Sequence, residues 1–330
     1  MNKRQRVSAA IAGDALDRVP VCLWRHWQGD DQRTADLVRA TLGFQATFDW
    51  DMVVLAPSPH YCLSGYGLSD VYDSSPLGER TITKHPIKTS LDWTEIRPLD
   101  PNRGDMHKQA EAIRLLCEAI DPEETPIIPV VYSPLSQAMR LAGSDVVLRH
   151  LRTQSERFHS GLTTLTDTTV RFIDAIRRFP IAGIYYVMDS AHHELLSEDE
   201  YVTFGLQYDQ KVLTILPSRW WCNMGFVGGT SPMLSLASTL PLSGFNWQSH
   251  MGNMDIEKAR GIVRGALFGG LGKRTHLQDS TPTSISETVR NLLNTSGGRR
   301  VIIGCDGAML VTTPQSNMLS VRETVQSLVR

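Results

Sequence analysis

The chain has 330 residues, with 33 basic and 35 acidic side chains and 7% aromatic residues. This balance of charge argues against a nucleic-acid-binding protein, which normally carries a basic face, and the absence of any apolar run of about 18 residues excludes a membrane-spanning helix. The basic residues 1–6 precede no apolar segment of signal-peptide length, and the five cysteines show no disulfide spacing, so we expect a cytoplasmic protein with reduced thiols.

The first half of the chain alternates short apolar runs with amphipathic segments. Strands are predicted over residues 19–24, 51–55, 125–132 and 183–188. Helices are predicted over residues 2–13, 31–41 with Gly43 as the stop, 105–120, and 144–178 as more than one helix. Between the second and third strands, residues 64–100 are rich in turn formers and contain a β-branched alternation near residue 81, which predicts an inserted hairpin or lid.

The second half continues the same alternation. Strands are predicted over residues 219–222, 242–247, 265–268 and 300–303, and helices over 197–216, 232–240, 255–263, 284–293 and 313–329. Ser197 and Glu200 have the spacing of a helix capping box. Eight strands alternating with helices predict an α/β fold, a single (β/α)8 TIM-type barrel domain over residues 1–330. The alternative, an open doubly wound sheet, lacks a GxGxxG motif after any strand.

Candidate functional residues follow the predicted strands, because the active site of such a barrel lies at the carboxyl ends of its strands. Cys222 and Cys305 each end or follow an apolar run, and two converging thiols suit a soft metal such as zinc. Two unrelated core cysteines would give the same pattern. Asp189 follows the fourth strand, where it would either orient a ligand or cap a turn.

A polar and aromatic cluster follows the first predicted strand. Arg25 is a candidate clamp for a carboxylate or phosphate, alongside His26, and Trp27 is a candidate stacking surface for a planar ligand. The alternative for Arg25 is a structural role in binding loop carbonyls. Trp247, near another strand end, suits an aromatic mouth for a large planar cofactor or aryl substrate, although core packing explains a tryptophan equally well.

Four segments together resemble the uroporphyrinogen decarboxylase superfamily. They are Ala15-Leu16-Asp17-Arg18-Val19-Pro20-Val21, Met188-Asp189-Ser190 followed by Leu196-Ser197, residues 266–270 leading to Thr281-Pro282, and Gly304-Cys305 leading to Thr313-Pro314-Gln315-Ser316-Asn317. The resemblance covers nearly the whole chain and implies a (β/α)8 barrel. It leaves two chemistries open, because the superfamily contains metal-free tetrapyrrole decarboxylases and zinc-dependent methyltransferases linked to corrinoids.

The methyltransferase branch implies a zinc site at the barrel mouth. That branch holds zinc with a His-x-Cys motif and a later cysteine, and Cys222 and Cys305 match its two cysteines. Trp220 stands where the family has the histidine, and its indole has no lone pair for a metal. His250 is the best substitute ligand. In this leading hypothesis a zinc-activated thiolate takes a methyl group from a corrinoid (cobalamin), with Arg25, Asp189 and Cys305 as catalytic residues. The implied partners are a small-molecule methyl acceptor and a corrinoid protein, and a homodimer is also expected.

The decarboxylase branch is the alternative, and it needs no cofactor. Arg25 matches the family's first arginine, and Ser190 matches a serine that contacts the substrate, whereas the second arginine falls at Gly29. The family's aspartate falls near Pro57 or Ser58 and its tyrosine near Met139, which argues against ordinary uroporphyrinogen decarboxylase activity. A third hypothesis is a non-catalytic barrel that binds a tetrapyrrole or corrinoid. In each case the substrate would contact Arg25, His26, Trp27, Ser190 and Trp247.

Overall fold

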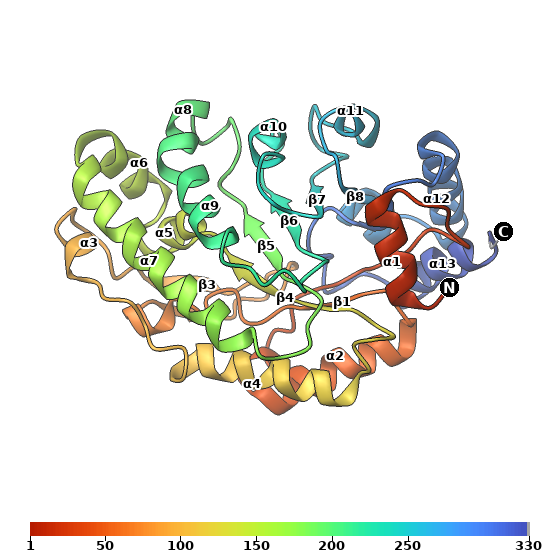
Figure 1. The fold of residues 1–330 in the computed structure, drawn as a ribbon, viewed down its shortest axis with the longest axis horizontal. Coiled ribbons are helices and arrows are strands. Elements are labelled where there is room, and N and C mark those ends of the chain that lie inside the picture. The colour runs from red at the N-terminus through yellow and green to blue at the C-terminus, as the bar shows by residue number, and fades with distance from the viewer. Residues whose placement is uncertain (329–330) are drawn as a thin grey trace.

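The computed structural model describes residues 1–328 and shows a curled parallel sheet surrounded by helices (Figure 1). Seven strands pair in the order β1-β4-β5-β6-β7-β8-β9, and every pairing is parallel. They are β1 (Val53–Leu55), β4 (Ile127–Tyr132), β5 (Tyr185–Met188), β6 (Met224–Val227), β7 (Gly244–Trp247), β8 (Ala266–Leu271) and β9 (Val301–Cys305).

The segment predicted as the first strand closes the sheet into a barrel. Val21 forms a parallel bridge with Ile303 of β9, and the backbone N–H of Cys22 donates to the Ile303 carbonyl at 2.9 Å. On its other side, the Val21 carbonyl accepts from the backbone N–H of Asp51, just before β1, at 2.9 Å. This segment therefore occupies the eighth place between β9 and β1, and the predicted (β/α)8 barrel is confirmed.

Helices follow most strands and pack outside the sheet (Figure 1). They are α1 (Lys3–Ala12), α2 (Thr34–Phe48), α3 (Asp92–Glu95), α4 (Gly104–Ala119), α5 (Pro134–Ala142), α6 (Ser144–Thr153), α7 (Ser155–Ile176), α8 (Glu198–Tyr201), α9 (Gln207–Leu213), α10 (Leu234–Ala237), α11 (Ile256–Arg260), α12 (Pro282–Ser296) and α13 (Gln315–Gln326). The capping box predicted at Ser197 is present at the start of α8. None of the helices within residues 1–328 combines the length and hydropathy needed to cross a bilayer.

Several predicted boundaries are wrong. The helix predicted to stop at Gly43 continues to Phe48, because Phe44 and Phe48 pack against each other with ring centroids 4.8 Å apart and offset the cost of about 1 kcal/mol of a mid-helix glycine. The strand predicted over 219–222 begins instead at Met224, since the apolar run extends beyond the residues that pair. Helix α5 was not predicted, and Val329, the last residue of the predicted closing helix, lies outside the described residues.

The region between the second and third barrel strands contains a small antiparallel ribbon. Here β2 (Ser69–Val71) pairs with β3 (Thr81–Lys84), with a register shift next to Ser69. The backbone N–H of Val311, in the loop after β9, donates to the Pro76 carbonyl of the connecting segment at 2.8 Å. This segment therefore reaches the loops at the carboxyl ends of the strands. Its use as a lid stays a prediction.

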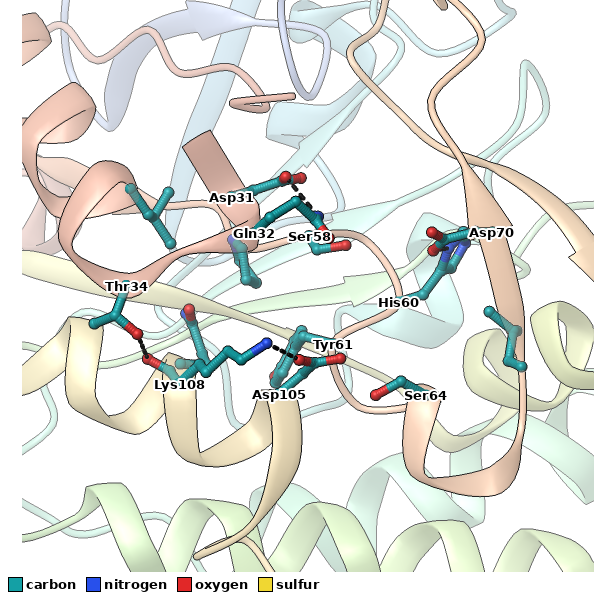
Figure 2. A pocket seen from close by; sticks show the side chains of 14 residues that line it. Asp31, Gln32, Thr34, Ser58, His60, Tyr61, Ser64, Asp70, Asp105 and Lys108 are labelled. Carbon is teal, nitrogen blue, oxygen red and sulfur yellow. Dashed lines mark hydrogen bonds and ion pairs between the residues drawn. The ribbon is translucent and has the colours of Figure 1, made fainter. Parts of the chain in front are cut away.

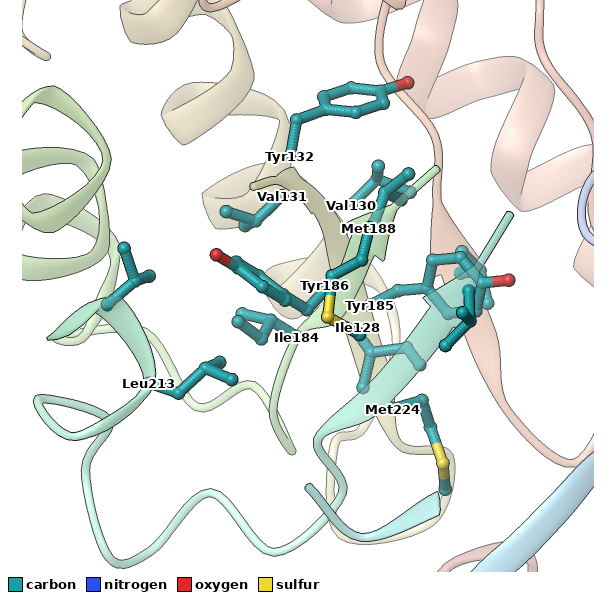
Figure 3. Close-up of a cluster of buried hydrophobic side chains, with 14 of the residues drawn as sticks. Ile128, Val130, Val131, Tyr132, Ile184, Tyr185, Tyr186, Met188, Leu213 and Met224 are labelled. Carbon is teal, nitrogen blue, oxygen red and sulfur yellow. The ribbon is translucent and has the colours of Figure 1, made fainter. Parts of the chain in front are cut away.

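The β4 and β5 side chains alternate between two apolar layers (Figure 3). Tyr185 points into the barrel, where its hydroxyl donates to Asn246 Oδ1 at 2.9 Å, while Tyr186 points outward and donates to Asp209 Oδ1 of α9 at 2.7 Å. This alternation is the period-2 geometry of a strand. It fills the barrel interior and leaves the carboxyl ends of the strands to carry polar groups.

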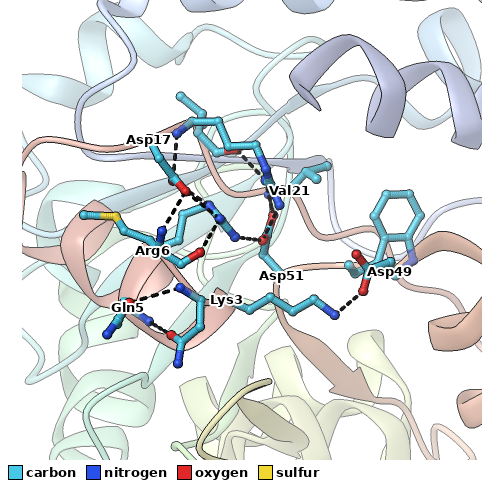
Figure 4. Close-up of polar contacts among 12 residues, drawn as sticks. Lys3, Gln5, Arg6, Asp17, Val21, Asp49 and Asp51 are labelled. Carbon is cyan, nitrogen blue, oxygen red and sulfur yellow. Dashed lines mark hydrogen bonds and ion pairs between the residues drawn. The ribbon is translucent and has the colours of Figure 1, made fainter. Parts of the chain in front are cut away.

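A buried ion network closes the opposite end of the barrel (Figure 4). Asp51 is fully buried and accepts from Arg6 Nη1 at 2.7 Å and Arg18 Nη1 at 2.6 Å. It also accepts from the backbone N–H of Val21 at 2.8 Å. A single carboxylate thus joins α1, the first strand segment and the start of β1.

Candidate active site

The carboxyl end of the barrel holds an ion pair between Arg140 and Asp189. Asp189 directly follows β5, and Arg140 comes from α5, which follows β4. Arg140 Nη2 lies 2.5 Å from Asp189 Oδ2, and the guanidinium lies 4.5 Å from the centroid of the Tyr132 ring at the end of β4. Solvent reaches both groups, because 18% of the Arg140 side chain and 30% of the Asp189 side chain are exposed.

The surroundings keep both members of this pair charged. Burial alone would raise the pKa of Asp189, but the charge of Arg140 and hydrogen bonds, including that from Ser136, lower it below its usual range. The nearby carboxylate raises the pKa of Arg140 despite its burial. Ser190 Oγ lies 3.3 Å from Asp189 Oδ1, so the predicted substrate-contacting serine orients the carboxylate.

A second polar group lies in the segment after β1 and consists of His60, Asp70 of β2 and Arg80 just before β3. His60 Nδ1 is 2.6 Å from Asp70 Oδ2, and Arg80 Nε donates to Asp70 Oδ1 at 2.5 Å. Burial lowers the pKa of His60, although the Asp70 hydrogen bond opposes that shift. The three side chains thus form a continuous hydrogen-bonded chain that ends at an imidazole.

The three residues predicted after the first strand are present near the mouth, but two of them are engaged with neighbours. Arg25 Nη1 donates to the Val311 carbonyl at 2.9 Å, and its guanidinium lies 4.5 Å from the Trp27 ring centroid. Trp27 also meets the edge of Phe44 at 5.4 Å. His26 is buried, and its Nδ1 has no partner within residues 1–328. Ligand binding by this cluster stays a prediction.

The predicted zinc ligands do not come together. Cys222 precedes β6 and Cys305 is the last residue of β9, so the two thiols lie at opposite ends of the parallel strands. Cys222 Sγ instead contacts Met52 Sδ at 3.6 Å. The residue at the end of β6 is Val227, which offers no ligand atom. The apolar run at Trp220 predicts the strand too early, because the run begins before the residues that pair.

The third predicted ligand, His250, is also occupied elsewhere. Its Nε2 lies 2.6 Å from the Gly270 carbonyl oxygen, and its ring stacks edge-on against His276 at 4.4 Å. The thiols of Cys222 and Cys305 are both buried, and burial raises the pKa of each. Within residues 1–328 no three His, Cys, Asp or Glu side chains are arranged to hold a metal ion, so the residues present do not fit a zinc site.

Trp247 is a core residue. Its side chain is only 1% exposed, and its indole N–H donates to the Met254 carbonyl at 2.6 Å. Burial of this degree is typical of a core residue, and contact between this ring and a substrate stays a prediction. The same strand supplies Asn246, whose Nδ2 donates to the Cys305 carbonyl at 2.9 Å and ties β7 to β9.

The sequence patterns described above predict neither α5 nor the place of Arg140 at the mouth. The signals for that helix are present in the sequence: Ser133 caps the first turn, Pro134 occupies the first helical position, and Gly143 ends the helix. An arginine on a helix that follows a barrel strand is a candidate for the mouth. No sequence spacing predicts the pairing of His60 with Asp70, which depends on the fold of the loop between β1 and β2.

Comparison with known proteins agrees with this architecture. A family model described as uroporphyrinogen decarboxylase (URO-D) matches residues 31–328. The chain is 28% identical to a uroporphyrinogen decarboxylase of Mycolicibacterium vanbaalenii over 255 residues, which is 70% of this chain and 69% of that protein. It is also 28% identical to one from Mycobacterium sp. strain KMS over 181 residues, which is 53% of this chain and 48% of that protein.

Two solved structures show the same fold. A methyltransferase from Methanosarcina mazei superposes with a TM-score of 0.88 at 18% identity, covering 100% of both chains. A B12-independent methionine synthase from Shewanella sp. W3-18-1 superposes with a TM-score of 0.57 at 11% identity, covering 95% of this chain and 94% of the other. At these identities the likeness concerns the fold, whereas the family model covers most of the sequence. The chain therefore belongs to the uroporphyrinogen decarboxylase family.

Proposed function

We propose that this chain is a carboxy-lyase that binds a carboxylate-bearing organic substrate in the barrel mouth through Arg140. The observation that carries the proposal is the solvent-accessible Arg140–Asp189 pair at the carboxyl ends of two adjacent strands. Arg140 Nε makes no hydrogen bond within residues 1–328, and its guanidinium is held over Tyr132. A guanidinium with free donors recognises a carboxylate, and the anionic Asp189 accepts an N–H of the same substrate.

The chemistry of decarboxylation suits a site of this kind. The bond between the carboxylate and the adjacent carbon breaks, CO2 leaves, and the electron pair left on carbon takes up one proton. The reaction therefore needs a binding cation and a proton donor, but no oxidant or reductant. The relatives named as uroporphyrinogen decarboxylases make uroporphyrinogen the first probe, although Ser58 and Met139 stand near the family's aspartate and tyrosine positions.

The leading hypothesis from the sequence, zinc-dependent methyl transfer from a corrinoid, has less support. Its predicted zinc ligands, Cys222, Cys305 and His250, do not come together in the structure. The likeness to the methyltransferase from Methanosarcina mazei concerns the fold alone. The corrinoid partner and the homodimer stay predictions. The test must therefore also be able to detect methyl transfer.

The test measures CO2 release and methyl transfer side by side. EDTA-treated protein is incubated anaerobically with uroporphyrinogens I and III and with a panel of pyrrole and aryl carboxylic acids. Protein supplied with zinc, and not treated with EDTA, is incubated separately with methylcobalamin and a thiol acceptor. We expect CO2 release by the wild type and a loss of about 100-fold in kcat/KM in Arg140→Gln, with Arg103→Gln, an exposed arginine, as the matched control. Demethylation of methylcobalamin that requires Cys305 and zinc, without CO2 release, would overturn the proposal.

A further inference from the structure

We propose that His60, held in place by Asp70 and Arg80, is the proton-transfer residue of this mouth. The inference rests on the proposed function, because it names the group that delivers the proton after CO2 leaves. His60 would be the catalytic group, and Asp70 and Arg80 would be positioning residues.

The hydrogen bonds fix which nitrogen of His60 is available. An ionised carboxylate only accepts hydrogen bonds, so at 2.6 Å from Asp70 Oδ2 the Nδ1 of His60 must carry its hydrogen. The neutral imidazole then presents Nε2 as a bare acceptor, and the protonated imidazole presents an Nε2–H. Arg80 fixes the other oxygen of Asp70 at 2.5 Å, which prevents the carboxylate from turning away. This is the base-and-orienter arrangement typical of acid–base catalysis.

His60 follows β1, at the end of the barrel where the strands have their carboxyl ends, and it borders a side cavity. On the mouth side, Arg140 is close enough for its charge to lower the pKa of His60. On the other side, His60 and Asp70 border a cavity of about 90 Å³ (Figure 2). Its lining is partly polar and partly apolar, with Asp31, Ser58 and Gln109 beside Leu37 and Leu68.

The cavity is suited to water. A volume of about 90 Å³ holds several water molecules, since one needs roughly 10–15 Å³. Gln109 is 2% exposed, and neither its amide nitrogen nor its amide oxygen has a partner within residues 1–328. Buried amides are normally hydrogen-bonded, so ordered water is the partner expected here. Water next to His60 relays from solvent the proton that replaces the one transferred.

The charges around His60 set the direction of its pH dependence. The groups that face it are Asp70 of β2, Arg80 and Glu79 before β3, Arg140 of α5, His26 after the first strand, and, around the cavity, Asp31, Asp105 and Lys108. Burial and Arg140 lower the pKa of His60, while Asp70 and Glu79 raise it, and the net shift is downward. The imidazolium is therefore the minor form at neutral pH and increases as the pH falls.

The step needs one proton from solvent and no oxidant or reductant. As CO2 leaves, the electron pair on the substrate carbon takes the proton from His60 Nε2, the N–H bond breaks, and the imidazole becomes neutral. A proton from bulk solvent, relayed by water in the side cavity, then returns to Nε2, so each cycle consumes one solvent proton and leaves no hydroxide behind. Because the imidazolium is the active form, kcat/KM should decline as the pH rises through the His60 pKa.

The first experiment needs no substrate. Nitrogen NMR of ¹⁵N-histidine-labelled protein reports which ring nitrogen carries hydrogen and the pKa of each histidine. We expect His60 as the Nδ1–H form with a lowered pKa, and a further downward shift in Asp70→Asn, because that substitution removes the charge that favours the imidazolium. His193→Gln, a change at an exposed surface histidine, identifies one resonance and should leave that of His60 unmoved. The inference is overturned if neutral His60 carries its hydrogen on Nε2, or if the pKa of His60 is the same in Asp70→Asn as in the wild type.

The second experiment uses whichever panel acid releases CO2. His60→Ala should lower kcat by at least about 100-fold with little change in KM, and added imidazole should restore part of the activity by entering the space vacated beside the cavity. Asp70→Asn should move the decline of the pH profile to lower pH. Full activity in His60→Ala refutes the inference and leaves the proposed function standing. If NMR finds the expected form but no acid releases CO2, the proposed function and the catalytic role of His60 fail together, while the positioning by Asp70 holds.

Discussion

Arg140 Nη2 and Asp189 Oδ2 lie 2.5 Å apart, and this contact joins the loop-helix unit after β4 to the residue that follows β5. The pair remains partly open to solvent, unlike Asp51, whose carboxylate is enclosed at the other end of the barrel. One end of the fold thus holds a buried ion network, and the other carries a partly exposed ion pair. This division agrees with the general rule that chemistry in such barrels lies at the carboxyl ends of the strands.

Asp51 should be the more sensitive of the two carboxylates to substitution. Asp51→Ala leaves Arg6 and Arg18 without their buried partner, and removal of one member of a buried ion pair costs about 3–5 kcal/mol. We expect a loss of that size in the free energy of unfolding measured by urea denaturation. Asp14→Ala, at an exposed position, should change it by less than about 0.5 kcal/mol. Equal effects of the two substitutions would contradict the role of Asp51 in closure.

Asp209 should make the stability depend on pH. Burial between the hydroxyls of Tyr186 and Tyr201 raises its pKa to about 7. The unfolded chain releases this proton near pH 4, so the folded state binds more protons between about pH 4 and 7, and stability falls as the pH rises through that window. The lost contribution is on the order of 4 kcal/mol.

The measurement is the free energy of unfolding of the wild type and Asp209→Asn at pH 5 and pH 8. The asparagine cannot ionise, so the variant should gain stability relative to the wild type as the pH rises. Asp174→Asn, at an exposed helix position, is the control and should show no such trend. A constant difference between Asp209→Asn and the wild type would show that Asp209 does not titrate in this range.

Substitution of Cys222 should not alter bound metal. Its thiol is buried against Met52 at the amino end of β6, away from the mouth. We expect the metal content of Cys222→Ser, measured by mass spectrometry on protein purified without a chelator, to equal that of the wild type. Stoichiometric zinc that disappears in Cys222→Ser would restore the zinc-dependent hypothesis.

The barrel could be predicted from the sequence because hydrophobic burial imposes it. Eight apolar runs separated by amphipathic segments leave few other ways to cover a sheet, and even the run at 19–24, which pairs through one bridge, was recognised. The exact boundaries of the strands could not be predicted from the sequence as well as their order. Trp220, Cys222, Met224 and Val227 are all buried, so burial alone does not mark where pairing begins.

The site was predicted only in part for a related reason. Asp189 was found because it directly follows a strand, where position in the chain determines position in the barrel. Arg140 lies near the end of α5, the helix that follows β4. It reaches the mouth only because its guanidinium lies over the ring of Tyr132, the last residue of β4. The pairing of His60 with Asp70 likewise depends on loop geometry that no periodic pattern encodes.

The most direct test of the central claim is binding of an acidic tetrapyrrole at Arg140. Uroporphyrin I, the stable oxidised octacarboxylate, can be titrated by fluorescence against wild type, Arg140→Gln and the control Arg103→Gln. The account predicts saturable binding to the wild type and the control, and affinity at least tenfold lower in Arg140→Gln, equivalent to about 1.4 kcal/mol. Equal affinity in all three proteins would contradict the assignment of Arg140 as the group that receives the substrate carboxylate.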